Sequence, residues 1–353
     1  MKFGPEHYVP VLKIKDNEKR ALEVLSRTYM GKFTPLLEVV ERKSDKPLGE
    51  HLDTAFKRLV TSFPKSETCF LDTHELAPDG DAGAEAVFAR AESEGMDYVP
   101  VVGLTRSVGN SPALDHGNGS VALRLSREEL EAGILPTAIP EFLNEHRLSP
   151  EQVDLIMDMG DVGMLIPVGV TGLANSFLGA VPNHKAWRTF TLSGCAFPRS
   201  MGKVGRNASL LVNRNEWMSW RDGLYVKRRS LTRLPTYSDC AIQHPSGVEG
   251  FDPRTMPTSA GARHASGDAW LLLKGESTRK VPPTIQFKRI AKELVSNAHG
   301  KHYLGTTHCT GCAEVDAAAR GAPKLGSLGV WRRIGTVHHV VTVLKDLSAL
   351  RWP

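Results

Sequence analysis

Charged residues stand at the points where apolar stretches of this chain end. The first such stretch ends with Lys13 and Lys15, and later ones end with Glu38, Asp72 and Asp158. Carboxylates can hold a hard cation such as Mg²⁺, and lysines can bind a phosphate or stabilise developing negative charge. We predict that all five residues are catalytic, and that Glu38, Asp72 and Asp158 are also metal ligands.

Two further residues belong to the same predicted site. Arg124 stands in a later apolar stretch and is a candidate substrate-binding residue, because a guanidinium pairs well with phosphate. Asp161 closely follows Asp158, although it could instead cap the next helix. The alternative for the whole set is a structural network of salt bridges in a polar interior.

The two lysines of the first stretch share one face if that stretch is a strand. Side chains alternate along a strand, so Lys13 and Lys15 follow Val11 on one side, while Leu12 and Ile14 face the other. Burying these ammonium groups costs several kcal/mol unless they are paired or solvated. We therefore expect anions beside them, from neighbouring strands, from a bound ligand, or from both.

Histidines in the last third of the chain suggest proton transfer or ligand binding. Asp239 and His244 are candidate catalytic residues as an acid–base pair, since histidine changes its charge near neutrality. The alternative is that Asp239 caps a turn and His244 ends a strand. His338 and His339 are candidate substrate-binding residues, but on a helix they point about 100° apart, so only one can face a given site. A helix end packed on the rest of the protein is the alternative for them.

The cysteines carry a weaker signal. Cys309 and Cys312 form one Cys-x-x-Cys pair with His302 nearby, but a structural zinc site needs four ligands and the sequence shows no second close pair. A redox pair would need a thioredoxin-like context, which is also missing. The five cysteines are few and mostly scattered, which favours a reducing cytoplasm over a disulfide scaffold.

Composition excludes some classes of protein. The 353 residues are 41% hydrophobic, which is ample for a globular core. No apolar run approaches the roughly 18 residues of a membrane span, and no apolar targeting segment follows the first residues. The net charge of +5 permits anionic ligands without indicating a nucleic-acid binder. The basic cluster at 227–229, beside Trp220 and Tyr225, suits either a nucleic-acid backbone or a solvated loop.

Alternating strand and helix signals organise residues 1–245. Strands are expected at 8–15, 33–40, 68–72, 98–104, 121–125, 153–158, 187–192 and 240–243, with helices between them, the last at 207–220. This pattern predicts a TIM-like (β/α)8 barrel, whose strands open into one mouth at their C-terminal ends. An open doubly wound sheet is the alternative, but no Gly-rich nucleotide motif follows the first strand.

Residues 246–353 are expected to complete or cover the barrel as a C-terminal extension. Residues 246–268 read as a long loop rich in Gly, Pro, Ser and Thr, followed by a short strand at 270–274 and a helix at 284–296. A short helix is expected at 314–320, and the tail at 331–347 should pack on the barrel. This extension has too little apolar sequence to form a core of its own.

Three segments resemble one family. They are the opening Tyr-x-Pro-x-Leu-Lys-x-Lys pattern of 8–22, the segment 239–245 with Asp-Cys-Ala-Ile-Gln-His-Pro, and the closing Trp-Arg-x-Ile-Gly-x-x-His-His of 331–339. Together they are similar to the phage "beta protein" family, which also occurs in bacterial genomes. The chain departs from that pattern at Cys240, where an aromatic residue is expected. The resemblance implies a setting in phage–host conflict and supplies no mechanism.

These observations lead to two hypotheses. The first is a cytoplasmic enzyme of phage–host conflict, or antiviral defence, that acts at the mouth of the barrel on a phosphate-bearing nucleotide or nucleic acid. It would be a metal-dependent hydrolase, such as a phosphodiesterase or nuclease, with Mg²⁺. The second is a non-catalytic binding or sensor protein that recognises a phage or host partner. Fold alone does not separate them.

Overall fold

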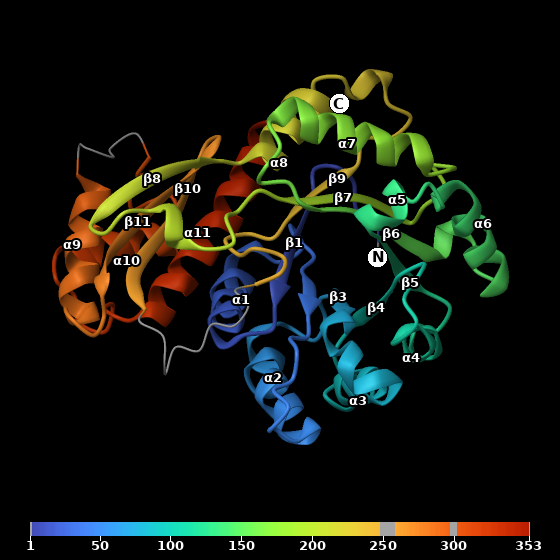
Figure 1. Ribbon diagram of the computed structural model, residues 1–353, viewed down its shortest axis with the longest axis horizontal. Coiled ribbons are helices and arrows are strands. Elements are labelled where there is room, and N and C mark those ends of the chain that lie inside the picture. Colours follow the sequence, from blue (N-terminus) through green and yellow to red (C-terminus); the bar gives the residue numbers. More distant parts are fainter. Residues whose placement is uncertain (1, 248–257, 297–301, 353) are drawn as a thin grey trace.

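The computed structural model describes residues 2–247, 258–296 and 302–352. Eight parallel strands close into a barrel in the order β1-β2-β3-β4-β5-β6-β7-β9 (Figure 1). Because β9 pairs with both β7 and β1, the barrel is closed and the open-sheet alternative is excluded. The predicted TIM-like barrel is thus confirmed. Its strands are Tyr8–Lys13 (β1), Leu36–Glu38 (β2), Cys69–Asp72 (β3), Tyr98–Val102 (β4), Val121–Leu125 (β5), Val153–Asp161 (β6), Thr189–Cys195 (β7) and Thr236–Asp239 (β9).

Helices surround the barrel and connect its strands. Their apolar sides pack on the strands, as α1 shows by burying Ala21, Leu22 and Leu25. The α-helices of this ring are Asp16–Tyr29 (α1), Leu48–Ser62 (α2), Gly80–Ser93 (α3), Asn110–His116 (α4), Arg127–Glu131 (α5), Leu135–Glu145 (α6) and Pro167–Ala180 (α7). Short turns of other helix types are His74–Asp79 (η1), Pro150–Gln152 (η2), Met201–Lys203 (η3), Ser219–Tyr225 (η4) and Arg228–Ser230 (η5), and Asn215–Met218 (α8) precedes η4.

A second layer packs against one side of the barrel. Its antiparallel sheet has the order β10-β11-β8, and helices cover it (Figure 1). The elements of this C-terminal layer are Ala208–Asn213 (β8), Ser259–Ser266 (β10), Ala269–Ser277 (β11), Pro283–Val295 (α9), Thr310–Ala319 (α10) and Leu328–Ala349 (α11). The long helix α11 lies between the sheet and the barrel, in contact with β10, α1 and β1.

Helix α11 belongs to two hydrophobic cores. Val337, Val340 and Val341 join the core of the barrel, whereas Trp331 and Ile334 join a separate core with α9 and β11. The expected C-terminal extension packed on the barrel is therefore present. The helix is also longer than the sequence pattern indicated, since 331–339 continues without a break into 340–347.

Two expected elements after β7 differ from the structure. The segment 207–220, expected to be a helix, begins instead with strand β8, which pairs with β11. Leu and Val suit either state, so a partner strand more than fifty residues later decides the outcome. The last barrel strand is β9, and the expected strand 240–243 is a turn in which Ala241 has φ 52°. The C-terminal layer therefore draws one of its strands from within residues 1–245.

The expected loop at 246–268 also contains structure. Its part at 248–257 lies outside the described residues, but Ser259–Ser266 forms β10. This strand consists largely of small residues, which are weak strand formers. Its partner β11 supplies the apolar side chains Trp270, Leu271 and Leu272, and β10 lies closely under α11.

Candidate functional site

Arg124 is the centre of an ion network in the barrel mouth. Its guanidinium donates hydrogen bonds to Glu38 Oε1 at 2.8 Å, Asp72 Oδ2 at 2.8 Å and Asp158 Oδ2 at 2.6 Å. Glu38 lies beside both Lys13 and Asp72 in the strand register, so parallel pairing brings these side chains to one end of the barrel. The structure thus unites five predicted site residues.

Lys13 and Arg106 extend this network on either side. Lys13 Nζ lies 3.3 Å from Glu38 Oε2 and also contacts Glu75. Arg106 donates two hydrogen bonds to Asp72, at 2.8 and 3.1 Å. The sequence interpretation missed Glu75, which lies in η1 directly after β3, and Arg106, which lies in the loop after β4. Their position a few residues beyond a strand end is the signal that would have found them.

The predicted Mg²⁺ ligands are held by cations of the protein itself. Burial alone would raise the pKa of Asp72, but Arg106 and Arg124 hold that pKa well below its ordinary value. Burial lowers the pKa of Arg124, and the charges of Asp158, Glu38 and Asp72 more than reverse this effect. The guanidinium occupies the space between the three carboxylates, so a divalent cation would have to displace it. Binding of Mg²⁺ at this site stays a prediction.

Lys15 does not share the environment of Lys13. Strand β1 ends at Lys13, and the backbone then turns, with the Lys15 N–H donating to the Lys13 carbonyl at 2.7 Å. Lys15 is exposed at the start of α1, and its side chain makes no hydrogen bond or ion pair within the described part of the chain. The expectation that both lysines face the same carboxylates is therefore correct for Lys13 only.

Lys15 instead belongs to a group of cations around one buried carboxylate. Glu18 accepts a hydrogen bond from Gln243 Nε2 at 2.6 Å, and its Oε2 has no hydrogen-bond partner among the described residues. Burial raises the pKa of Glu18, while Arg332, Lys15 and Arg263 act in the opposite direction. We call Lys15, Arg263 and Arg332 the cationic rim, because they lie where α1 and β1 meet the C-terminal layer.

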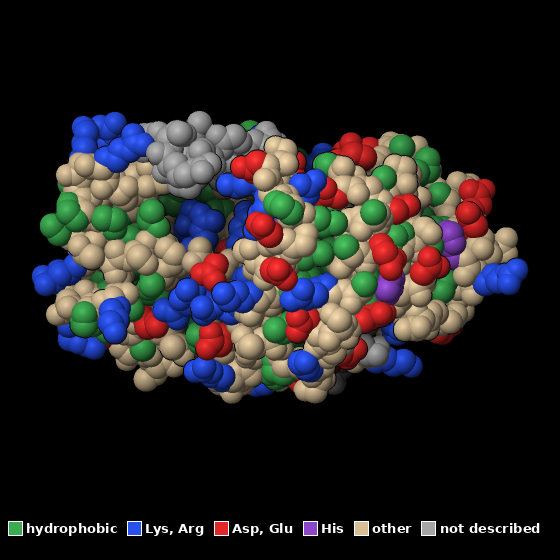
Figure 2. Space-filling model, turned by 90° about the horizontal axis from the view of Figure 1, so that it is seen from below, with side chains coloured by type: hydrophobic (Ala, Val, Ile, Leu, Met, Phe, Trp, Pro, Cys, Tyr) green, Lys and Arg blue, Asp and Glu red, His purple; other side chains and the backbone are tan. Residues whose placement is uncertain are grey.

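The cationic rim has more positive charge than the neighbouring carboxylates neutralise. Burial and then the charge of Arg332 lower the pKa of Arg263 to about 9, and the Nε of Arg263 has no hydrogen-bond partner in the described residues. Figure 2 shows Lys and Arg side chains in a hollow between the C-terminal layer and the barrel. Glu75 is the second carboxylate that acts on Lys15, so three cations and two carboxylates leave a net positive site that suits an anionic ligand.

His244 pairs with Asp161. Its Nε2 lies 3.1 Å from Asp161 Oδ2, and its Nδ1 accepts a hydrogen bond from the Ser246 N–H at 3.2 Å. The ring proton therefore sits on Nε2, facing the carboxylate. Asp161 extends from the C-terminal end of β6, so this pair stands at the rim of the mouth. The sequence interpretation had paired His244 with Asp239, which the structure does not bring together.

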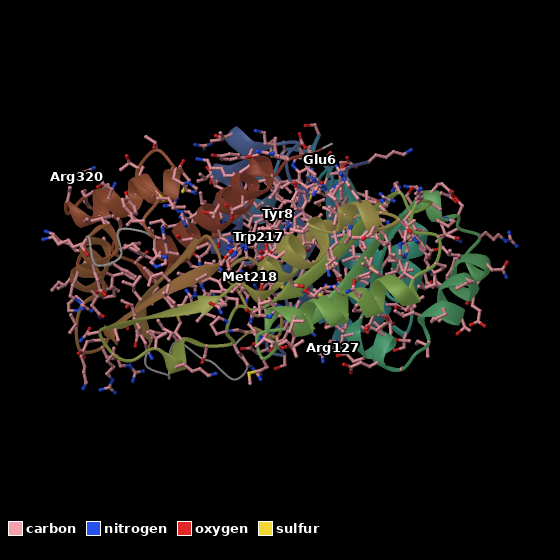
Figure 3. All side chains as sticks on the ribbon, turned by 90° about the horizontal axis from the view of Figure 1, so that it is seen from above. Glu6, Tyr8, Arg127, Trp217, Met218 and Arg320 are labelled. Carbon is pink, nitrogen blue, oxygen red and sulfur yellow. The ribbon has the colours of Figure 1, made fainter. Side chains whose placement is uncertain are left out.

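Asp239 lies in a buried network outside the mouth. It accepts hydrogen bonds from Tyr8 at 2.5 Å, Tyr237 at 2.8 Å and His339 at 2.9 Å. Figure 3 shows Tyr8 near the centre of the molecule. Burial would raise the pKa of Asp239, but His339 is the main influence that lowers it to about 2. Trp270 donates to the other ring nitrogen of His339 at 3.2 Å, which fixes the ring between the sheet and the barrel.

His338 faces a different cluster from His339. Its Nδ1 lies 3.2 Å from Cys312 Sγ, within the C-terminal layer. The two histidines therefore serve separate sites, as helical geometry requires, and both are fully buried. The basic cluster at 227–229 overlaps the start of η5, where the Arg228 guanidinium lies 4.1 Å from the centre of the Tyr225 ring.

The chain matches one known protein family over nearly its whole length. The family model described as Beta protein matches residues 8–345, from the first barrel strand to the last turns of α11. The chain belongs to the Beta protein family. The match covers both the barrel and the C-terminal layer, so the Beta protein unit includes both layers. A comparison with curated proteins finds no match for this Beta protein. None of the helices in its described residues has the length and apolar character that crossing a bilayer requires.

Proposed function

We propose that this Beta protein binds a phosphate-bearing substrate, a nucleotide or nucleic acid, across the cationic rim and the barrel mouth, and hydrolyses it. The supporting observation is the charge of the rim, where Lys15, Arg263 and Arg332 all act on the buried carboxylate of Glu18. A phosphate would supply the missing negative charge, and arginine is well shaped to bind it.

The mouth offers the groups that such a hydrolysis needs. Water would attack phosphorus, and the bond from phosphorus to the leaving oxygen would break. His244 would give that oxygen its Nε2 proton if the substrate replaced Asp161 at this nitrogen, and it would regain a proton from the attacking water. Arg124 and Lys13 would stabilise the negative charge that develops on the phosphoryl oxygens. Glu38, Asp72 and Asp158 would take up Mg²⁺ if the substrate drew Arg124 away from them.

The proposed setting is phage–host conflict in the cytoplasm. It rests on the family resemblance, and it is consistent with five cysteines that are all free of disulfides. Phage or host proteins are the further partners that this setting suggests.

A non-catalytic binding or sensor protein is the second candidate function. One observation favours it, because the carboxylates of the mouth are already paired with Arg124, Arg106 and Lys13. A site whose charges are so fully paired can hold its shape without turning over a substrate.

A binding screen with a turnover readout tests both functions. The protein is mixed with nucleoside triphosphates, cyclic dinucleotides and single-stranded oligonucleotides, with and without MgCl₂, and binding and product formation are measured. Binding with product supports the hydrolase, and binding without product supports the sensor. A protein that binds no phosphate-bearing compound in either condition would remove the proposed function.

A further inference from the structure

Four side chains with metal-binding chemistry meet inside the C-terminal layer. Cys309 and Cys312 start α10, His264 comes from β10, and His338 comes from α11. The ligand atoms of His264, Cys312 and His338 all lie within 4.8 Å of one another. Cys309 Sγ lies 3.6 Å from His338 Nδ1, so it completes a set of two sulfurs and two nitrogens.

The distances match the spacing of a tetrahedral zinc site. Bonds of about 2.3 Å from zinc to sulfur and about 2.0 Å to nitrogen place the ligand atoms about 3.3–3.8 Å apart. His338 Nδ1 lies 3.2 Å from Cys312 Sγ and 3.6 Å from Cys309 Sγ. The rings of His264 and His338 lie stacked with their centroids 3.7 Å apart, so one ring would have to turn for both nitrogens to point at the same ion.

A hydrogen bond from one ring nitrogen to the backbone orients each histidine, as is common for histidines that bind a metal. His338 Nε2 donates to the Ala265 carbonyl at 2.6 Å, which leaves Nδ1 unprotonated and directed at the sulfurs. The backbone of His302 accepts a hydrogen bond from the His264 ring. The Nε2 of His264 is buried without a hydrogen-bond partner among the described residues. A buried nitrogen without a partner costs stability, and a metal bond would remove that cost.

The two cysteines are held close together at the start of α10. Cys309 is the N-cap of α10, where the Cys312 N–H donates to its sulfur at 3.3 Å. All four side chains are buried, which suits a closed structural site.

We propose that Cys309, Cys312, His264 and His338 bind one structural zinc ion that joins β10, α10 and α11. The inference is independent of the proposed function, because this cluster lies apart from the barrel mouth. Two sulfur and two nitrogen ligands in tetrahedral geometry select zinc, and the ion would hold the C-terminal layer together on the same helix that packs on the barrel.

Metal content tests this proposal on the full chain, produced without a histidine tag. Elemental analysis should find about one zinc ion per chain. Cobalt replacing zinc should give the intense visible bands of a tetrahedral thiolate site. Cys312→Ser should reduce zinc content about tenfold or more. The control Cys69→Ser changes a buried cysteine of β3 and should keep the metal.

The wild-type measurement stands even if Cys312→Ser fails to fold. A reduced wild-type protein that takes up neither zinc nor cobalt would overturn the proposal. A Cys309–Cys312 disulfide in the isolated protein, with no metal after reduction and reconstitution, would identify a redox pair instead. Full zinc content in a folded Cys312→Ser variant would also refute it.

Discussion

Individual charges in the mouth have different surroundings, and these surroundings determine their roles. Lys13 is buried between Glu38 and Glu75, so its charge is already paired. Lys15 is exposed and has no such partner in the described structure. Of the two lysines, only Lys15 has its charge available for a ligand.

Replacing each lysine by methionine should separate these roles. Lys13→Met should lower the free energy of unfolding by about 3 kcal/mol, because Glu75 loses its ion-pair partner and Glu38 keeps only Arg124. Lys15→Met should keep the wild-type thermal midpoint and weaken binding of a nucleoside triphosphate by about tenfold. Thermal melts and titration calorimetry measure both effects, with Lys57→Met on α2 as an exposed control. Wild-type binding by a folded Lys15→Met protein would remove Lys15 from the site.

Glu216 makes stability depend on pH. Burial and then the charge of Asp239 raise the pKa of Glu216 to about 8, although Arg214 acts in the opposite direction. The folded protein therefore holds this proton more tightly than the unfolded chain does. Its contribution to stability is fully present below the unfolded pKa, near 4.5, and is lost as pH rises through about 8.

The variant Glu216→Gln should remove this dependence. A neutral amide needs no proton to be buried, so the variant should lose less stability than the wild type between pH 5 and pH 8, with a difference of a few kcal/mol at about 1.4 kcal/mol per pKa unit. Denaturant unfolding across this pH range measures it. Parallel pH profiles for the two proteins would show that Glu216 is not protonated in the fold.

At the scale of elements, the close approach of α11 to β10 determines the packing of the C-terminal layer. A Cβ atom added to Gly335 would lie 2.9 Å from the Arg263 carbonyl oxygen and 2.9 Å from Ile242. A backbone atom cannot move aside as a side chain can, so glycine is required where the helix crosses the strand.

Gly335→Ala should therefore destabilise the protein by about 1–3 kcal/mol despite the better helix propensity of alanine. The matched control is Gly172→Ala in α7, where a Cβ would meet nothing within 4 Å. That variant should gain up to about 1 kcal/mol, since alanine favours the helix. Chemical denaturation compares the two. A gain in stability in both variants would show that α11 and β10 are less closely packed than the structure indicates.

At the scale of the whole molecule, α11 joins the two layers. It places Val337, Val340 and Val341 in the core of the barrel and Trp331 in the core of the C-terminal layer. The layers share one helix and a large apolar contact, so we expect them to unfold together.

Ending the chain before Trp331 should lower the free energy of unfolding by several kcal/mol, because an aromatic side chain and several aliphatic side chains leave both cores. A chain that ends after Leu350 keeps α11 and loses only Trp352 and its neighbours, so its midpoint should fall much less. Thermal unfolding by circular dichroism measures both. An unchanged midpoint in the shorter chain would show that the barrel is stable alone.

The sequence by itself determined the barrel and most of its mouth. Apolar strands that alternate with amphipathic helices predict a parallel barrel, and parallel strands must bring Lys13, Glu38, Asp72, Arg124 and Asp158 to one end. These properties follow from local periodicity and from a general rule of the fold. For the same reason, the sequence could indicate a charged mouth without indicating which charges are paired.

Only the tertiary structure decided the partners that come from distant parts of the chain. It paired His244 with Asp161, placed Asp239 beside His339, and turned 208–213 into a strand through its partner β11. It also completed the Cys309–Cys312 pair with two histidines from β10 and α11. The physical reason is that such contacts depend on how the layers pack. Packing joins residues that are far apart in the sequence, and no periodic pattern in the sequence indicates which of them will meet.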